Sequence, residues 1–167
     1  YIDLQQRIVS YNFTGLDQDG SELDQTSEMS FFNPKVGFNY SLNEKSSLYA
    51  FAGLGNKEPS RDDFTESTPD SRPSHESLID IELGYRYSSE TVSISANFYN
   101  MHYNNQLILT GELNDVGSAV RVNIPDSYRR GVELTGSFQL MDRLLWRLNA
   151  TFSENKIAQF NEFIDNW

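Results

Sequence analysis

Residues 79–98 read IDIELGYRYSSETVSISANF, and this stretch decides the fold. Ile79, Ile81 and Leu83 alternate with polar or small neighbours, and a second alternating run covers residues 92–98 after a short Ser-rich turn. Successive side chains of a β-strand point to opposite faces, so a period of two indicates a strand with one apolar and one polar face. We therefore predict two antiparallel strands joined by a tight turn.

The same period recurs along most of the chain, and helical periodicity is hard to find. Further alternating runs cover residues 36–42, 48–54, 132–140 and 146–152, with a weaker run over about 2–13. The pattern predicts an all-β fold, an antiparallel up-and-down meander of about seven strands, each about 9–13 residues long.

The predicted connections alternate between two sizes. Short turns are expected at residues 43–46, 88–90 and 141–142, whereas long polar stretches cover about 14–30, 57–77 and 111–127, with a polar tail from Glu154. Outer-membrane β-barrels have short turns on one side of the membrane and long loops on the other. The predicted strands are also long enough to cross a bilayer. In a barrel the apolar face would meet lipid and the polar face would line the lumen.

Composition supports this interpretation and excludes several classes of protein. The 167 residues contain no cysteine, which excludes a disulfide scaffold, a thiolate zinc site and a cysteine nucleophile. The net charge of −11 argues against nucleic acid as a partner. Most of the 24 acidic residues but few of the 13 basic ones fall in the long stretches and the tail. The rest of the chain is therefore close to neutral, as expected of a wall that crosses a membrane.

Charged and aromatic residues of the strands have expected positions. The strand charges Asp80, Glu82, Arg86, Glu133 and Arg147 all fall on the polar face, where a lumen would receive them. Aromatic side chains near the strand ends suit a girdle at the membrane interface, because one end of the ring is apolar and the other polar. The residues expected there are Tyr40, Tyr49, Tyr85, Tyr87, Tyr99, Tyr103, Tyr128 and Trp146.

Two segments carry a family resemblance. Residues 33–64 read NPKVGFNYSLNEKSSLYAFAGLGNKEPSRDDF, and residues 81–138 contain ELGYRY, NFYNMHYNNQLILTGELNDVG and NIPDSYRRGVELTGSF. Together they resemble the barrel of TonB-dependent outer-membrane receptors, especially those of iron-chelate type. The matching residues are Asn33, Pro34, Lys35, Leu48, Tyr49, Lys57, Glu58, Pro59, Ser60 and Arg61, followed by Tyr128, Arg129, Gly131 and Glu133.

The resemblance implies a larger protein. Such receptors have about 22 strands and an internal plug, so residues 1–167 would form a partial barrel without the plug, in the outer membrane of a Gram-negative bacterium. The chain starts at Tyr1 and stops at Trp167, and we interpret it as a piece of a longer protein or as a mature form. The parent would capture a ferric siderophore or another metal chelate and import it with the TonB system acting through the plug. No catalytic residue, cofactor or resident metal is implied.

Loop residues are the candidates for ligand binding. We predict that Arg61, Asp62, Asp63 and Arg121 lie near a ligand or a loop–loop contact. Asp62 and Asp63, with Glu66, are alternatively a solvated acidic loop or ligands of a hard cation. Lys57, Arg61 and Arg72 are alternatively partners of an anionic chelate or of the nearby Glu58 and Asp62. His75 and His102 are expected to be a loop surface histidine and a strand histidine.

Two other kinds of protein remain open at this point. One is a complete outer-membrane barrel of about eight strands with a structural or adhesive role, and the other is a soluble β-sandwich binding module. On the barrel interpretation, an isolated seven-stranded sheet has two open edges and an uncovered apolar face. Such a piece is expected to oligomerise through its edges or to depend on detergent.

Overall fold

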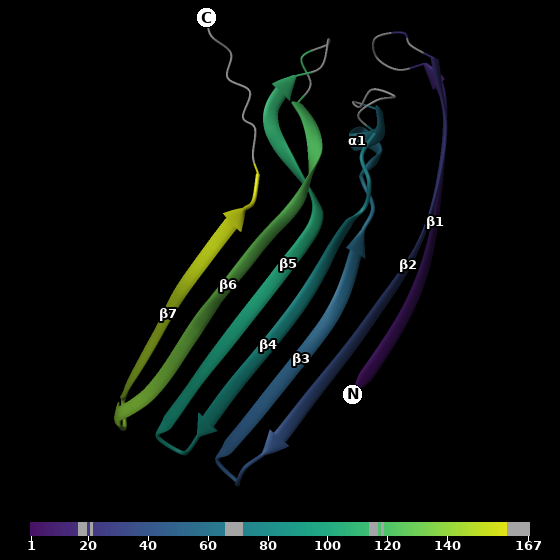
Figure 1. The fold of residues 1–167 in the computed structure, drawn as a ribbon. Helices are drawn as coiled ribbons and strands as arrows, with labels where there is room; N and C mark the ends of the chain where they lie inside the picture. Colours follow the sequence, from purple (N-terminus) through teal and green to yellow (C-terminus); the bar gives the residue numbers. More distant parts are fainter. Residues whose placement is uncertain (17–19, 21, 66–71, 114–116, 118, 160–167) are drawn as a thin grey trace, which may run out of the picture.

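The computed structural model describes residues 1–16, 20, 22–65, 72–113, 117 and 119–159. Its strands form one antiparallel sheet in the order β1-β2-β3-β4-β5-β6-β7 (Figure 1). The elements are β1 (Ile2–Leu16), β2 (Glu22–Ser41), β3 (Ser46–Lys57), α1 (Arg61–Thr65), β4 (Glu76–Ser88), β5 (Val92–Leu113), β6 (Ala119–Met141) and β7 (Leu144–Ile157). The predicted all-β meander of seven strands is confirmed, and the single sheet excludes the two-sheet sandwich for the described residues.

The short turns lie together at one end of the sheet, where Figure 1 shows three tight hairpins, and the long connections lie at the other end. Within the first of these turns, the backbone N–H of Leu42 donates to the carbonyl of Ser46 at 2.9 Å. The end with the long connections is called the distal end below.

Strand lengths differ from the prediction. Residues expected in long loops extend the strands instead: β1 reaches Leu16 and β2 begins at Glu22, while β5 reaches Leu113 and β6 begins at Ala119. The tail prediction is also wrong at its start, because β7 continues to Ile157. The extension of β2 over residues 22–30 is mostly polar and lacks the alternation by which a half-buried strand is recognised. The extension of β6 instead alternates Val120, Val122 and Ile124 with Arg121 and Asn123, a strand pattern within a stretch that was predicted to be a loop. Backbone pairing defines these extensions, as in the continuous register from Ile2–Val36 to Leu16–Glu22.

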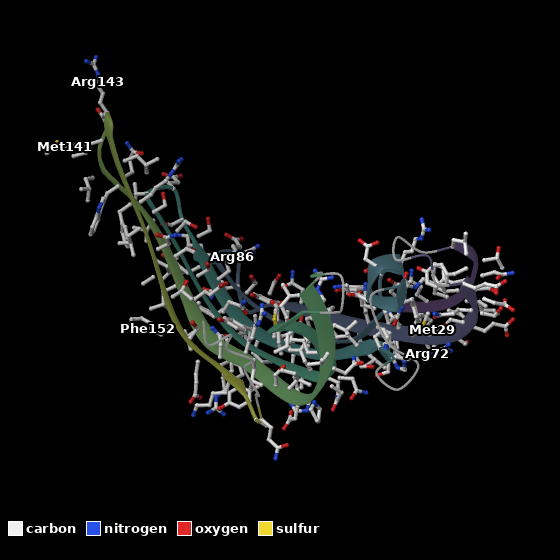
Figure 2. All side chains as sticks on the ribbon, turned by 90° about the horizontal axis from the view of Figure 1, so that it is seen from above. Met29, Arg72, Arg86, Met141, Arg143 and Phe152 are labelled. Carbon is white, nitrogen blue, oxygen red and sulfur yellow. The ribbon has the colours of Figure 1, made fainter. Side chains whose placement is uncertain are left out.

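Apolar side chains lie on the exposed convex face of the sheet. Ile81, Leu83 and Leu134 are 41%, 52% and 38% exposed, whereas the large apolar side chains buried among the described residues are Phe31, Phe64 and Ile124. In Figure 2 Phe152 projects from the convex side and Arg86 from the concave side. The sheet is therefore apolar where a soluble protein would be polar. We call the exposed apolar side chains of the convex face the apolar belt.

The concave face carries the five strand charges predicted to lie there. Because side chains alternate along a strand, Asp80 and Glu82 point opposite to Ile79 and Ile81, and Arg147 points opposite to Trp146.

The prediction that the aromatic residues form an interfacial girdle agrees with the strand register only in part. Tyr40, Tyr85, Tyr87, Tyr128 and Trp146 share the convex face, whereas Tyr49, Tyr99 and Tyr103 alternate onto the concave face.

Two of the concave tyrosines cover glycines on neighbouring strands. Tyr49 is the register partner of Gly84, and Tyr99 is the partner of Gly131. A Cβ atom at Gly84 would lie 1.9 Å from the Tyr49 ring, and one at Gly131 would lie 2.5 Å from the backbone oxygen of Phe152. These glycines therefore let aromatic rings lie flat against the concave wall.

We predict that Gly131→Ala destabilises the sheet by about 1–3 kcal/mol, because the added methyl group overlaps backbone that cannot yield without shifting β7. The control is Gly55→Ala, on the same face of β3, where a Cβ atom would meet nothing within 4 Å. Denaturant unfolding of both variants measures the difference. Equal stabilities would show that the close contact at Gly131 carries no cost.

Candidate functional site

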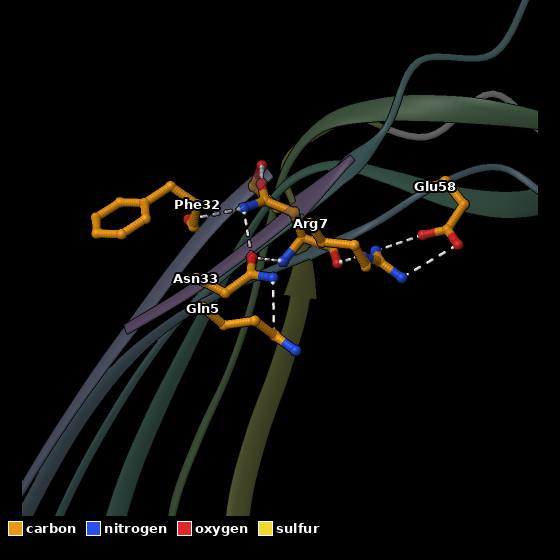
Figure 3. A network of polar contacts seen from close by, with 7 residues as sticks. Gln5, Arg7, Phe32, Asn33 and Glu58 are labelled. Atoms are coloured by element: carbon orange, nitrogen blue, oxygen red, sulfur yellow. Dashed lines mark hydrogen bonds and ion pairs between the residues drawn. The ribbon is translucent and has the colours of Figure 1, made fainter. Parts of the chain in front are cut away.

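The site begins where the sheet divides at its distal end. The pairing of β2 with β3 ends at Lys35–Gly53, although β3 continues to Lys57. The next residue of β2, Pro34, has no backbone N–H to donate. Beyond it the amide side chain of Asn33 replaces the backbone ladder, because its Oδ1 accepts hydrogen bonds from the backbone N–H of Asn56 at 3.0 Å and from Asn56 Nδ2 at 2.8 Å (Figure 3).

The amide network extends to both neighbouring strands. Asn33 Nδ2 donates to Gln5 Oε1 on β1 at 3.2 Å, and Ser77 Oγ on β4 donates to Asn56 Oδ1 at 2.7 Å. Asn33 itself is only 5% exposed. Four strands are thus joined by side chains at the level where two of them stop sharing backbone bonds.

Arg7 on β1 anchors the connection between β3 and β4. Its Nη1 and Nη2 donate to Glu58 Oε1 and Oε2 at 3.1 and 2.5 Å, and Nη2 also donates to the carbonyl of Asn56 at 3.1 Å (Figure 3). The guanidinium lies 5.1 Å from the ring centroid of the buried Phe31, whose other neighbour is His75 at 5.3 Å. Glu58 therefore pairs with a distant strand residue, and the prediction that it pairs within its own loop is wrong.

A short helix, α1, follows in this connection. Ser60 precedes it as a cap, since its Oγ accepts from the Asp63 backbone N–H at 3.3 Å, and Asp63 Oδ2 in turn accepts from the Ser60 backbone N–H and from Ser60 Oγ, each at 2.7 Å. Phe64 is 6% exposed and packs 6.1 Å from the Tyr11 ring and 5.6 Å from the Phe13 ring of β1. The connection is thereby held over the concave side of the β1–β2 hairpin.

The opposite side of the connection is tied to β6. Arg121 Nη1 donates to Asp63 Oδ1 at 3.0 Å, and the Asp63 side chain is only 7% exposed. Burial opposes ionisation of Asp63, but hydrogen bonds from Ser60 and Arg121 outweigh it and hold the pKa of this carboxyl below its ordinary value. Asn123 adds a second tie, because its Oδ1 accepts from the Ser74 backbone N–H at 2.7 Å and its Nδ2 donates to the Ser74 carbonyl at 3.0 Å.

The structure brings two of the four predicted site residues together. Asp63 on α1 and Arg121 on β6 form the ion pair, while Arg61 and Asp62 are exposed on α1, and the role of all four residues near a ligand stays a prediction. Sequence reasoning missed Arg7, Asn33 and Asn123. Their partners lie 18 to 51 residues away, and only the strand register reveals them.

The chemistry available at the distal end is binding by charge and by hydrogen bonds. Within the described residues, no group of three or more His, Asp or Glu side chains is arranged to hold a metal ion, and Glu66 lies outside those residues. His75 is exposed, as predicted, and the strand residue His102 lies 3.4 Å from Asp126.

The concave face also contains incompletely paired polar groups. A hollow of about 270 Å³ is lined by Glu82, Asn97, Tyr99, Met101, Arg129 and Glu133. The buried oxygens Asn97 Oδ1 and Asp80 Oδ1 have no hydrogen-bond partner within the described part of the chain. Such groups are costly unless a partner satisfies them.

None of the helices in the described ranges is long and apolar enough to cross a membrane.

Comparison with known proteins gives one family. Residues 6–166 match the family model described as TonB dependent receptor-like, beta-barrel. No curated protein matches the chain.

Solved structures share the fold at low sequence identity. The copper transporter OprC has 16% identity and a TM-score of 0.71, with 81% of this chain and 22% of that chain covered. The FrpB iron transporter from Neisseria meningitidis has 18% identity and a TM-score of 0.69, covering 92% and 23%. The siderophore receptor PirA from Pseudomonas aeruginosa has 14% identity and a TM-score of 0.65, covering 79% and 30%. The chain thus spans less than a third of the length of these proteins.

We predict that the order of α1 depends on pH through Asp63. Its pKa in the folded chain is below the ordinary value of 3.8, so the stabilisation is present above about pH 4 and is lost as the pH falls through the lowered pKa. Backbone hydrogen exchange of residues 60–65, corrected for intrinsic rates, should therefore lose protection only in that acidic range.

The matched variants are Arg121→Gln and Arg61→Gln. Loss of the Arg121 partner should reduce protection of the same amides at neutral pH by about 1 kcal/mol, since the pair is half-exposed and partly screened. Arg61→Gln should leave it unchanged. Equal effects from both variants would contradict a role for the ion pair.

Proposed function

The chain belongs to the TonB-dependent receptor-like β-barrel family, and from this premise we propose that it is a wall segment of an outer-membrane receptor that imports a scarce nutrient. Two of the similar solved structures are named as transporters of copper and iron, and a third as a siderophore receptor, which supports a ferric siderophore or another metal chelate as the ligand. The outer membrane of a Gram-negative bacterium is the corresponding location.

The observation that carries this proposal is the apolar belt. A convex face rich in exposed Ile, Leu and Phe is unfavourable in water but is favourable against lipid tails. The opposite face carries Asp80, Glu82 and Arg86, which would be strongly disfavoured in hydrocarbon. Only one arrangement in a membrane satisfies both faces, with the convex side toward lipid and the concave side toward an aqueous lumen.

The tilt of the belt supports the same arrangement. Convex residues that are paired with one another across the sheet form a row. One row is apolar from Phe38 through Leu83 and Phe98 to Phe152. Two convex rows further toward the distal end, Ile79 on β4 is still apolar, but the residues paired across from it are His102, Tyr128 and Lys156. The edge of the belt therefore moves from Ile79 on β4 to the row of Leu83 and Phe152 on β7, on average about one residue per strand, which corresponds to strands tilted by about 35° from the membrane normal. Barrels in membranes have strand tilts of this size.

The complete barrel in this proposal has about 22 strands and encloses a plug. Residues 1–167 form a partial wall, and the plug lies elsewhere in the parent protein. Asp80 Oδ1 and Asn97 Oδ1 on the concave face are among the groups that a plug inside the lumen would satisfy. Coupling to the TonB system acts through that plug.

Ligand capture is assigned to the distal end of the concave side. Arg61, Asp62, Asp63 and Arg121 lie at the connection between β3 and β4, which reaches from the β1–β2 hairpin to β6. The acidic character of the long connections favours a neutral or cationic chelate, or a metal that bridges carboxylates. The role is binding and transport, without bond-making chemistry.

Removed from its barrel, the segment retains two open edges, β1 and β7, and an uncovered belt. The isolated chain therefore associates through these edges or requires detergent. Light scattering in the absence of detergent tests this point, and a stable monomer would contradict it.

The membrane assignment predicts a difference between adjacent residues. Leu134→Arg places a charge in the belt and should cost about 2–4 kcal/mol in a bilayer, whereas Thr135→Arg places it in the lumen and should cost far less. Unfolding of the complete protein in lipid vesicles measures both. If the convex face met water instead of lipid, Leu134→Arg would cost little, because Leu134 is already 38% exposed. Nearly equal effects of the two variants would therefore refute the lipid-facing assignment.

The nutrient assignment is tested by binding to the complete protein. Purified from the outer-membrane fraction, it should bind at least one member of a panel of ferric chelates, and Asp62→Asn with Arg61→Gln should weaken that binding. The control is Lys45→Gln in the turn at the opposite end of the sheet. Affinity that falls with added salt would indicate a cationic ligand, and no binding to any chelate would exclude the siderophore assignment.

A further inference from the structure

Two basic side chains lie on the lipid-facing side of the sheet, directly beyond the apolar belt. Arg130 is the next convex residue after Val132 toward the distal end of β6, and Lys156 is the second after Phe152 on β7, with Glu154 between them. The other Lys and Arg residues of the described strands alternate onto the concave face; these are Arg7, Lys35, Lys57, Arg86, Arg121, Arg129 and Arg147. A ligand inside the lumen cannot be reached from the convex face, so this pair requires a different explanation.

The pair is held together by one carboxylate. Arg130 Nε donates to Glu154 Oε2 at 2.8 Å, and Lys156 Nζ lies 2.5 Å from Glu154 Oε1. The Arg130 guanidinium also lies 4.8 Å from the Tyr128 ring centroid. Two cations share a single negative charge, which leaves a local excess of one positive charge among these three residues. The cations are 52% and 61% exposed, so their outer sides are accessible.

The level of the pair identifies what faces it. Val132 and Phe152 form the last apolar row on these strands, and the following rows carry Arg130 with Glu154 and then Tyr128 with Lys156. If the belt meets lipid tails, the groups one and two rows further out meet lipid headgroups. Long basic side chains at this level keep their stems near hydrocarbon and extend their charges to the interface.

We propose that Arg130 and Lys156 form a binding site for the phosphate of a lipid headgroup in the outer leaflet. Glu154 lies between the two cations and neutralises one of their charges, Tyr128 packs against Arg130, and the phosphate accepts hydrogen bonds from both cations on their exposed side. The inference rests on the proposed membrane location of the wall, and it concerns the outside of the barrel rather than the nutrient path.

The test uses the complete protein, delipidated in an uncharged detergent. Native mass spectrometry titrates it with dioleoyl phosphatidic acid and with dioleoylglycerol, which has the same tails without the phosphate. The wild type should bind the phosphatidic acid at least about tenfold more tightly. Arg130→Gln with Lys156→Gln should weaken that binding by about 30-fold and remove the preference.

The matched control is Arg129→Gln with Arg147→Gln, which removes the same charge from the concave face of the same two strands. It should bind phosphatidic acid like the wild type. Equal losses in the two double variants would overturn the proposal, as would a wild type that does not distinguish the two lipids. Inorganic phosphate that displaces the lipid at equal concentration would overturn the headgroup assignment.

Glu154→Gln separates binding from structural support. Removal of the shared carboxylate leaves both cations, so phosphatidic acid should bind more tightly, by about fivefold. Weakening equal to that of the double Arg130 and Lys156 variant would instead show that the three residues act only in folding. A protein absent from the membrane fraction would refute the proposed function. A membrane protein without a preference for phosphate would refute only this inference.

Discussion

The pairing of backbone N–H and C=O groups between neighbouring strands is the constraint on which the rest of this structure depends. With few large apolar side chains buried among the described residues, a central core cannot hold the chain together. Each strand is instead joined to the next in sequence by a long antiparallel ladder. In hydrocarbon such a ladder is favoured, because water is absent and an unpaired polar group is costly there. The ladder thus allows the side chains to be apolar outside and polar inside.

The ladder is interrupted at one position, and the distal architecture follows from that interruption. Pro34 cannot donate a backbone hydrogen bond, and beyond it β2 and β3 are joined by the Asn33 amide instead of by backbone pairs. The space that opens between these strands on the concave side is occupied by the β3–β4 connection. Arg7 and Phe13 hold one side of this connection, and Arg121 and Asn123 hold the other. Replacement of Pro34 would therefore affect contacts between strands that are not neighbours in the sheet.

The sequence predicts the wall well and the distal end poorly, for a physical reason. Where one face of the sheet is apolar and the other polar, side chains alternate as in residues 79–98, so strand number, order and facing could be predicted. Beyond the belt both faces are polar, so the strand character of residues 22–30 left no pattern to recognise. Asp63 and Arg121 could be singled out as charged loop residues. Their pairing, and the role of Arg7, depend on register between distant segments, which local sequence does not encode.

The oblique edge of the belt has a consequence for changes in chain length. Added residues at the distal hairpin ends only lengthen polar ladders, so insertions and deletions there are compatible with the wall. One residue inserted into β4 between Ile79 and Tyr85 would instead move every side chain on one side of the insertion to the opposite face of the sheet. Two inserted residues would keep the faces but shift part of the apolar segment by about 7 Å along the strand. Evolution of this segment is therefore free to vary loop length at one end while the length of the apolar span stays fixed.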